Sequence, residues 1–168
     1  FYDYILKKKG EHGGMIFAYI MARAIKKQPG LFLNYIEDFF FNTKDQKICN
    51  LVMDKAIYPL LKKDALVHID LILNWVKKDN KMLEESIFKL LSKLIGMDAK
   101  LIEPIFKKLE TSWLYATPNI VKLNSKFLKA IYKKDKKFYL NVYINYQTTR
   151  NPIFAEILCE AICCYNDN

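Results

Sequence analysis

The sequence predicts an all-α protein, specifically a right-handed α-solenoid of four to five antiparallel helix pairs. Amphipathic segments begin at Gly30, Asp64, Asp98 and Asp135, which are 34, 34 and 37 residues apart, and another amphipathic segment precedes each one. A repeat of about 20 to 50 residues with two helices per unit is typical of helical-repeat proteins. The connections of about two to five residues favour antiparallel neighbours.

The helices themselves indicate why they should stack. Each is about 10 to 17 residues long, too short to be stable alone in water, and each is apolar over more than one face. One antiparallel pair would leave an apolar face in water, and stacked pairs cover it. A compact bundle of the same helices is the alternative. No segment of the sequence favours a β-strand.

The N-terminal part is predicted to contain a helix end, a linker and two further helices. Residues 1–13 are expected to be the end of a preceding helix, stopped by Gly10, plus a linker that contains His12-Gly13-Gly14. Met15–Lys27 is the next predicted helix, with lysines in its last turn where the helix dipole stabilises cations. Pro29-Gly30 is a strong helix breaker, and Leu31–Phe41 is predicted to follow as a short apolar helix.

Capping residues and prolines set the later boundaries. Thr43 and Gln46 have capping-box spacing, and Pro59 should kink the helix that they start. Asp64, Asn80, Asp98, Thr117 and Asn151 stand where side-chain oxygens would cap the next helices, and Gly96 should close one of them. The predicted helices are 46–62, 65–77, 81–95, 99–110, 118–134, 136–146 and a last one from Pro152.

The chain resembles the HEAT and armadillo class of solenoids over about residues 14–165. The resemblance is carried by the period, the two-helix unit and a proline, Pro59, within a first helix. It implies a non-catalytic scaffold that presents a helical surface to another protein. Armadillo proteins hold extended peptides with an asparagine ladder, but Asn34, Asn74 and Asn141 lie at different offsets within their units. That binding mode is therefore not carried over.

Composition bounds the class of protein. The hydrophobic fraction of 52% and the aromatic fraction of 14% exclude a disordered chain. Four cysteines, at 49, 159, 163 and 164, are too few and too clustered for a disulfide scaffold, which favours an intracellular location, cytoplasmic or nuclear. No apolar run approaches the roughly 20 residues of a membrane span. Because the chain starts without Met and within a helical pattern, we expect a fragment of a longer solenoid, with 1–168 forming a single repeat domain.

The formal charge of +9 comes almost entirely from lysine, since arginine occurs only at 23 and 150. A basic balance is compatible with nucleic acid, an acidic protein or an anionic membrane as partner. An A/T-rich genome would also produce part of this excess, because the chain is rich in Lys, Asn, Ile, Tyr and Phe together. Phosphate recognition favours arginine, whose planar fork binds phosphate through two hydrogen bonds. The scarcity of arginine therefore counts against a dedicated nucleic-acid surface.

The strongest candidate site is a row of lysines on the helix at 118–134. Spacings of 4, 3 and 4 put the four lysines on one face, opposite Ile120, Leu123, Phe127 and Ile131. Tyrosines on the following helix would add the aromatic component that single-stranded nucleic acid uses. The alternatives are an acidic protein partner, or a solvated outer face with half-buried tyrosines. The candidate binding residues are Lys122, Lys126, Lys129, Lys133, Lys137, Tyr139 and Tyr143.

No catalytic or metal-binding pattern stands out. Cys159, Cys163 and Cys164 lie close together, but a metal would need a fourth ligand, so we expect buried thiols that act as small hydrophobes. His68 and Asn74 do not share a helical face, and no nucleophile stands near them. We therefore predict no catalytic residue, no metal, no cofactor and no small-molecule substrate. The predicted function is a protein-binding scaffold; the alternatives are RNA or DNA binding through residues 118–137, or a structural spacer.

Overall fold

The computed structural model describes residues 2–43, 45–76, 80–114 and 117–162, with the backbone alone for residues 2, 3 and 5–11. Every regular element in this part of the chain is helical, which confirms the all-α prediction. The α-helices are α1 Tyr2–Ala24, α2 Pro29–Asn42, α3 Gln46–Val52, α4 Tyr58–Lys63, α5 Ala65–Val76, α6 Lys81–Met97, α7 Ile102–Glu110, α8 Pro118–Tyr132, α9 Lys136–Tyr146 and α10 Pro152–Ala161. A π-helical turn, η1 Met53–Ile57, joins α3 to α4, and the 3-10 turns η2 Ala99–Leu101 and η3 Thr111–Leu114 flank α7.

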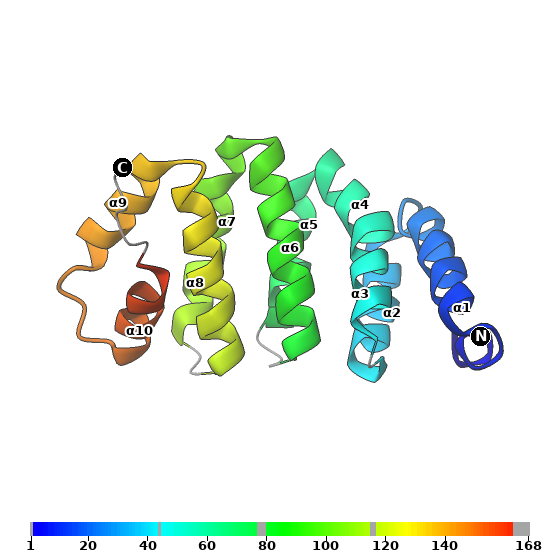
Figure 1. Ribbon diagram of the computed structural model, residues 1–168. Coiled ribbons are helices and arrows are strands. Elements are labelled where there is room, and N and C mark those ends of the chain that lie inside the picture. Colours follow the sequence, from blue (N-terminus) through cyan, green and yellow to red (C-terminus); the bar gives the residue numbers. More distant parts are fainter. Residues whose placement is uncertain (1, 44, 77–79, 115–116, 163–168) are drawn as a thin grey trace.

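The helices lie in two rows (Figure 1). In one row α1, α3, α6, α8 and α10 stand side by side, and each packs on the next. Behind them, α5 packs on α7. The ring of Phe40 in α2 contacts that of Trp75 in α5, and the ring of Phe106 in α7 contacts that of Phe138 in α9. Each row therefore brings together segments that are several tens of residues apart in the sequence.

One continuous apolar core fills the space between the rows. Each helix contributes a stripe with the 3.6-residue period; the stripe of α8 is Ile120, Leu123, Phe127 and Ile131, all at most 1% exposed. These four residues are the apolar side predicted opposite the lysines, and that part of the prediction is confirmed. None of the described helices is long and apolar enough to cross a membrane.

The prediction of a helix end and linker within residues 1–13 is wrong. The helix α1 is continuous from Tyr2 to Ala24 and contains Gly10, Gly13 and Gly14. Gly13 and Gly14 are buried, and a Cβ atom on Gly14 would lie 2.6 Å from Cδ1 of Ile48 in α3. Gly14 therefore permits close packing of α1 on α3, whereas the sequence alone indicated a linker here.

Most predicted caps are confirmed. The side chains of Asn80, Thr117 and Asn151 accept hydrogen bonds from backbone N–H groups in the first turns of α6, α8 and α10. The N-cap of α3 is Asp45 and not Thr43, because the Asp45 carboxylate accepts from the N–H groups of Lys47 and Ile48 at 2.8 and 3.2 Å. The predicted helix end at Lys77 lies outside the described residues.

Pro59 has the predicted effect on its helix. The π-helical turn η1 comes immediately before it, and the N–H of Tyr58 donates to the carbonyl of Met53. Proline lacks an N–H and its ring collides with the carbonyl four residues earlier in a regular helix. The wider turn accommodates that carbonyl, so α3 continues into α4 through an irregular turn instead of ending. Gly96 does not end α6, which continues to Met97.

Candidate functional site: a lysine-lined groove between α6 and α8

The predicted lysine row lies on the outer side of α8. Thr117 and Pro118 start this helix, and its apolar stripe turns the opposite side toward the core. Lys122, Lys129 and Lys133 are exposed, while the side chain of Lys126 is 43% exposed. Lys129 lies in the last turn, where the helix dipole stabilises a cation and offsets part of the repulsion between the lysines.

A groove of about 490 Å³ runs between α6 and α8. Three of the predicted lysines, Lys126, Lys129 and Lys133, line the groove together with Ala130 and Lys134. The predicted Lys122 and Lys137 do not line it. The contribution of α6 was missed from the sequence. The sequence does contain a pattern that could have indicated it, because Phe88, Ser92 and Ile95 follow the i, i+4, i+7 spacing of one helical face. The lining residues are Phe88, Lys89, Ser92, Ile95, Lys126, Lys129, Ala130, Lys133 and Lys134.

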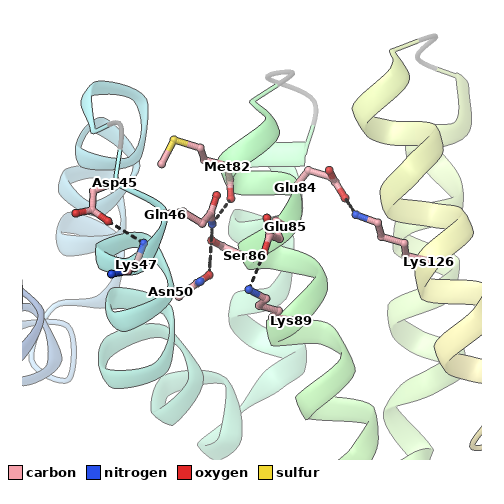
Figure 2. Close-up of polar contacts among 10 residues, drawn as sticks. All are labelled: Asp45, Gln46, Lys47, Asn50, Met82, Glu84, Glu85, Ser86, Lys89 and Lys126. Atoms are coloured by element: carbon pink, nitrogen blue, oxygen red, sulfur yellow. Dashed lines mark hydrogen bonds and ion pairs between the residues drawn. The ribbon is translucent and has the colours of Figure 1, made fainter.

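Two of the groove lysines form ion pairs with α6 (Figure 2). The Nζ of Lys126 lies 2.8 Å from Oε1 of Glu84, and that of Lys89 lies 2.7 Å from Oε1 of Glu85. The hydrogen bond from Lys89 lowers the pKa of Glu85, and the positive charges of Lys89 and Lys126 lower it further. Both carboxylates lie near the start of α6, so this end of the groove is close to neutral.

The other end of the groove carries unbalanced positive charge. Lys129, Lys133 and Lys134 form no ion pair within the described part of the chain. Lys129 and Lys133 are four residues apart at the end of α8, and like charges at that spacing repel by a few tenths of a kcal/mol. An anion bound between these lysines would add attractive interactions that offset their mutual repulsion.

The floor of the groove is apolar. Ile95 is 1% exposed, and Phe88 and Ala130 are half-buried. The Nζ of Lys126 lies 5.8 Å from the ring centroid of Phe88, within the range of a cation–π interaction. The Oγ of Ser92 is buried and has no hydrogen-bond partner in the described part of the chain. The groove thus combines an apolar floor, cationic side chains along its walls and the hydroxyl of Ser92.

The Glu84–Lys126 pair gives a first testable prediction. The side chain of Glu84 is only 6% exposed, so Lys126→Met would leave a buried carboxylate without its partner. We expect the free energy of unfolding to fall by about 1–2 kcal/mol, less than for a fully buried pair because Lys126 is partly solvated.

Urea denaturation followed by circular dichroism measures this loss. Lys122→Met, one turn earlier and exposed, is the matched control and should change stability by less than about 0.5 kcal/mol. The double variant Glu84→Leu/Lys126→Met should recover part of the loss, because both charges are then gone. Equal stability of the Lys126 and Lys122 variants would show that the pair is without structural effect.

A polar network fixes α6 against α3 (Figure 2). The Nε2 of Gln46 donates to Oγ of Ser86 at 2.7 Å and to the carbonyl of Met82 at 3.1 Å, and Oγ of Ser86 donates to Oδ1 of Asn50 at 3.0 Å. On the other side of α8, Oγ of Ser125 donates to Glu160 of α10 at 3.0 Å. Buried polar groups satisfied in this way hold neighbouring helices in one register. The walls of the groove are therefore held in place from both sides.

The predicted tyrosines do not join the lysines. Tyr139 is 5% exposed and its hydroxyl donates to the carbonyl of Ala161 at 2.9 Å. The hydroxyl of Tyr143 donates to the carbonyl of Leu158 at 2.7 Å. Both side chains thus pack α9 against α10, and the ring of Tyr139 has no free face on which a base could stack. The expectation of a lysine-and-tyrosine surface is corrected on this point.

The cysteines are placed differently from the expectation. Cys159 is exposed, not buried, and Cys163 and Cys164 lie outside the described residues. Cys49 is fully buried, and desolvation raises the pKa of its thiol to about 12, so it is protonated at neutral pH. Within residues 2–162, apart from the gaps named above, no group of three or more His, Cys, Asp or Glu side chains could hold a metal ion.

A second pocket, distinct from the groove and of about 600 Å³, lies on the outer face of α1 at the end of the row. Exposed apolar side chains line it, among them Met15, Ile16 and Tyr19. Arg23 and His12 lie at its edge. It is a separate surface from the groove, because α3 stands between α1 and α6 (Figure 1).

The arrangement of the groove suits binding. Its carboxylate neighbours, Glu84 and Glu85, are engaged in ion pairs, and the Oγ of Ser92 has no base within hydrogen-bonding distance. Cationic side chains over an apolar floor can hold an anionic ligand that also has an apolar part. No family model, no curated protein and no solved structure matches the chain.

Proposed function

We propose that this chain is a non-catalytic scaffold, a right-handed α-solenoid of the HEAT and armadillo type that binds another protein. The order of packing supports the solenoid, because α1, α3, α6, α8 and α10 contact one another in turn, and α1, α6 and α8 also contact α2, α5 and α9 of the other row. The groove between α6 and α8 is the observation that carries the binding role. Its walls are fixed by polar contacts, and the lysines at one end have no ion-pair partner among the described residues.

The groove favours a protein over a nucleic acid as the ligand. Proteins that bind single strands combine cationic side chains with aromatic rings on which bases stack. Here Tyr139 and Tyr143 are occupied by α10, and the groove contains lysine but no arginine. An apolar floor suits an aliphatic or aromatic side chain better than a sugar-phosphate chain.

Selection of binders from a random peptide library tests the binding role without assuming a chemistry. We expect peptides that bind saturably and protect one contiguous surface from hydrogen exchange. Scrambled versions of the selected peptides are the control and should bind at least tenfold more weakly, about 1.4 kcal/mol. A library that yields no saturable binder would support a structural spacer and contradict the proposal.

Binding of RNA or DNA is the alternative function, supported by the exposed lysines of α8. The variant Lys129→Glu/Lys133→Glu/Lys134→Glu tests it and leaves Lys126 paired with Glu84. If the variant binds single-stranded oligonucleotides at low salt as well as the natural sequence does, the alternative fails. A loss that disappears at high salt would support it, since release of counterions makes such binding salt-dependent.

A further inference from the structure

We propose that the groove between α6 and α8 receives a short segment of a partner protein that carries carboxylates at one end and apolar anchors at the other. The carboxylates contact Lys129, Lys133 and Lys134, and the anchors contact Phe88 and Ala130. The inference rests on the proposed function and adds the chemistry and the orientation of the partner.

Charge complementarity identifies the ligand as acidic. Lys129, Lys133 and Lys134, near the C-terminal end of α8, have no carboxylate partner in the described part of the chain. Lys126 and Lys89, by contrast, are paired with Glu84 and Glu85. An incoming carboxylate gains contact with three cations and displaces no internal ion pair. Attraction of this kind accelerates association and selects the partner by sign.

The distribution of charge also fixes the orientation. Lys126 lies opposite Glu84, near the beginning of α6, so acidic groups placed there would meet two carboxylates. The acidic part of the ligand therefore lies toward Lys133 and Lys134, beyond the last turn of α8. Phe88 lies between the two ends, next to Lys126.

The apolar floor distinguishes this ligand from a simple polyanion. Phe88 and Ala130 are half-buried, so an anchor placed on them removes apolar surface from water. Short segments bind tightly when a few anchors enter fixed pockets.

Fluorescence anisotropy with a defined probe tests the inference. The probe is a short labelled peptide with Leu and Phe at one end and a cluster of Glu at the other; its counterparts replace Glu by Gln, or Leu and Phe by Ser. At low salt the wild-type chain should bind the probe saturably and each counterpart at least about tenfold more weakly. Rising salt should weaken the interaction, because screening acts on exposed charges.

Two triple variants with the same change in net charge locate the site. Lys129→Glu/Lys133→Glu/Lys134→Glu should weaken binding by at least about tenfold, whereas Lys62→Glu/Lys63→Glu/Lys100→Glu, at exposed positions that do not line the groove, should change it by less than about threefold. Ala130→Leu fills the floor without a change of charge and should weaken binding with an unchanged salt dependence. Circular dichroism confirms that each variant keeps its helices.

Several outcomes would overturn the inference. Equal weakening by both triple variants would indicate general attraction to the basic chain. Unchanged binding of the Ser counterpart would exclude a role for the apolar floor, and tighter, groove-dependent binding of single-stranded oligo(dT) would assign the groove to nucleic acid. If peptides selected from the library bind the Lys129/Lys133/Lys134 triple variant as tightly as the wild-type chain, the scaffold role is retained and the groove is excluded as its binding site.

Discussion

Replacing Trp113 with alanine is expected to lower the free energy of unfolding by about 3–5 kcal/mol, the largest effect of any single change proposed for this chain. Trp113 is fully buried in η3. Its ring lies 5.6 Å from that of Phe106, 5.3 Å from that of Tyr146 and 5.2 Å from that of Phe154, measured between centroids. The indole therefore joins α7, α9 and α10, and its removal leaves a cavity among three helices that no single neighbour can fill.

Denaturation followed by circular dichroism at the helical band measures the loss. Leu114→Ala is the matched control: the next residue along the chain is 70% exposed and should cost less than about 0.5 kcal/mol. Trp113→Phe should cost less than the alanine variant, because a ring remains and the indole N–H, which has no hydrogen-bond partner among the described residues, is removed. A Trp113→Ala loss below about 1 kcal/mol would show that the aromatic cluster does not join these helices.

Gly14→Val is expected to destabilise the protein by about 3 kcal/mol. A Cβ atom at this position would lie 2.6 Å from Cδ1, 2.7 Å from Cγ1 and 3.0 Å from Cγ2 of Ile48. Because Ile48 is 8% exposed and branched at Cβ, it cannot turn away, so α1 and α3 must separate. Gly96→Val, where a Cβ atom would meet nothing within 4 Å, should change stability by less than about 1 kcal/mol.

The compensating variant Gly14→Val/Ile48→Ala makes this test specific. It exchanges the volumes of the two side chains across the interface between α1 and α3, and swaps that conserve volume are tolerated best. We expect the double variant to be more stable than the sum of the single losses by more than about 1 kcal/mol. Additive losses would contradict direct contact between the two positions.

Features whose hydrogen bonds are local could be predicted from the sequence. The helix predicted at 136–146 has the same bounds as α9, and Asp135 caps it through a bond to the N–H of Phe138, three residues away. Asn80, Thr117 and Asn151 cap their helices across two or three residues in the same way. Such bonds depend on nearby residues alone, so the pattern in the sequence is sufficient.

Features that depend on packing were predicted less well. Gly13 and Gly14 have the composition of a linker, yet both lie within α1 and Gly14 packs against Ile48 of α3. The tyrosines of α9 have the spacing of an exposed stripe, but α10 supplies the carbonyl groups that bind their hydroxyls. Cys159 lies in an apolar segment and is nevertheless exposed. For the glycines and the tyrosines the deciding neighbour belongs to another element.

The sequence by itself determined that the chain is helical, where most helices begin and which side of α8 carries the lysines, because caps and hydrophobic periodicity act within a few residues. Only the tertiary structure decided that Phe88, Lys89 and Ser92 of α6 face those lysines, and that Glu84 neutralises Lys126 from a position 42 residues away. Contacts of that range follow from how helices pack, and packing depends on the shapes of whole surfaces, which no local pattern encodes.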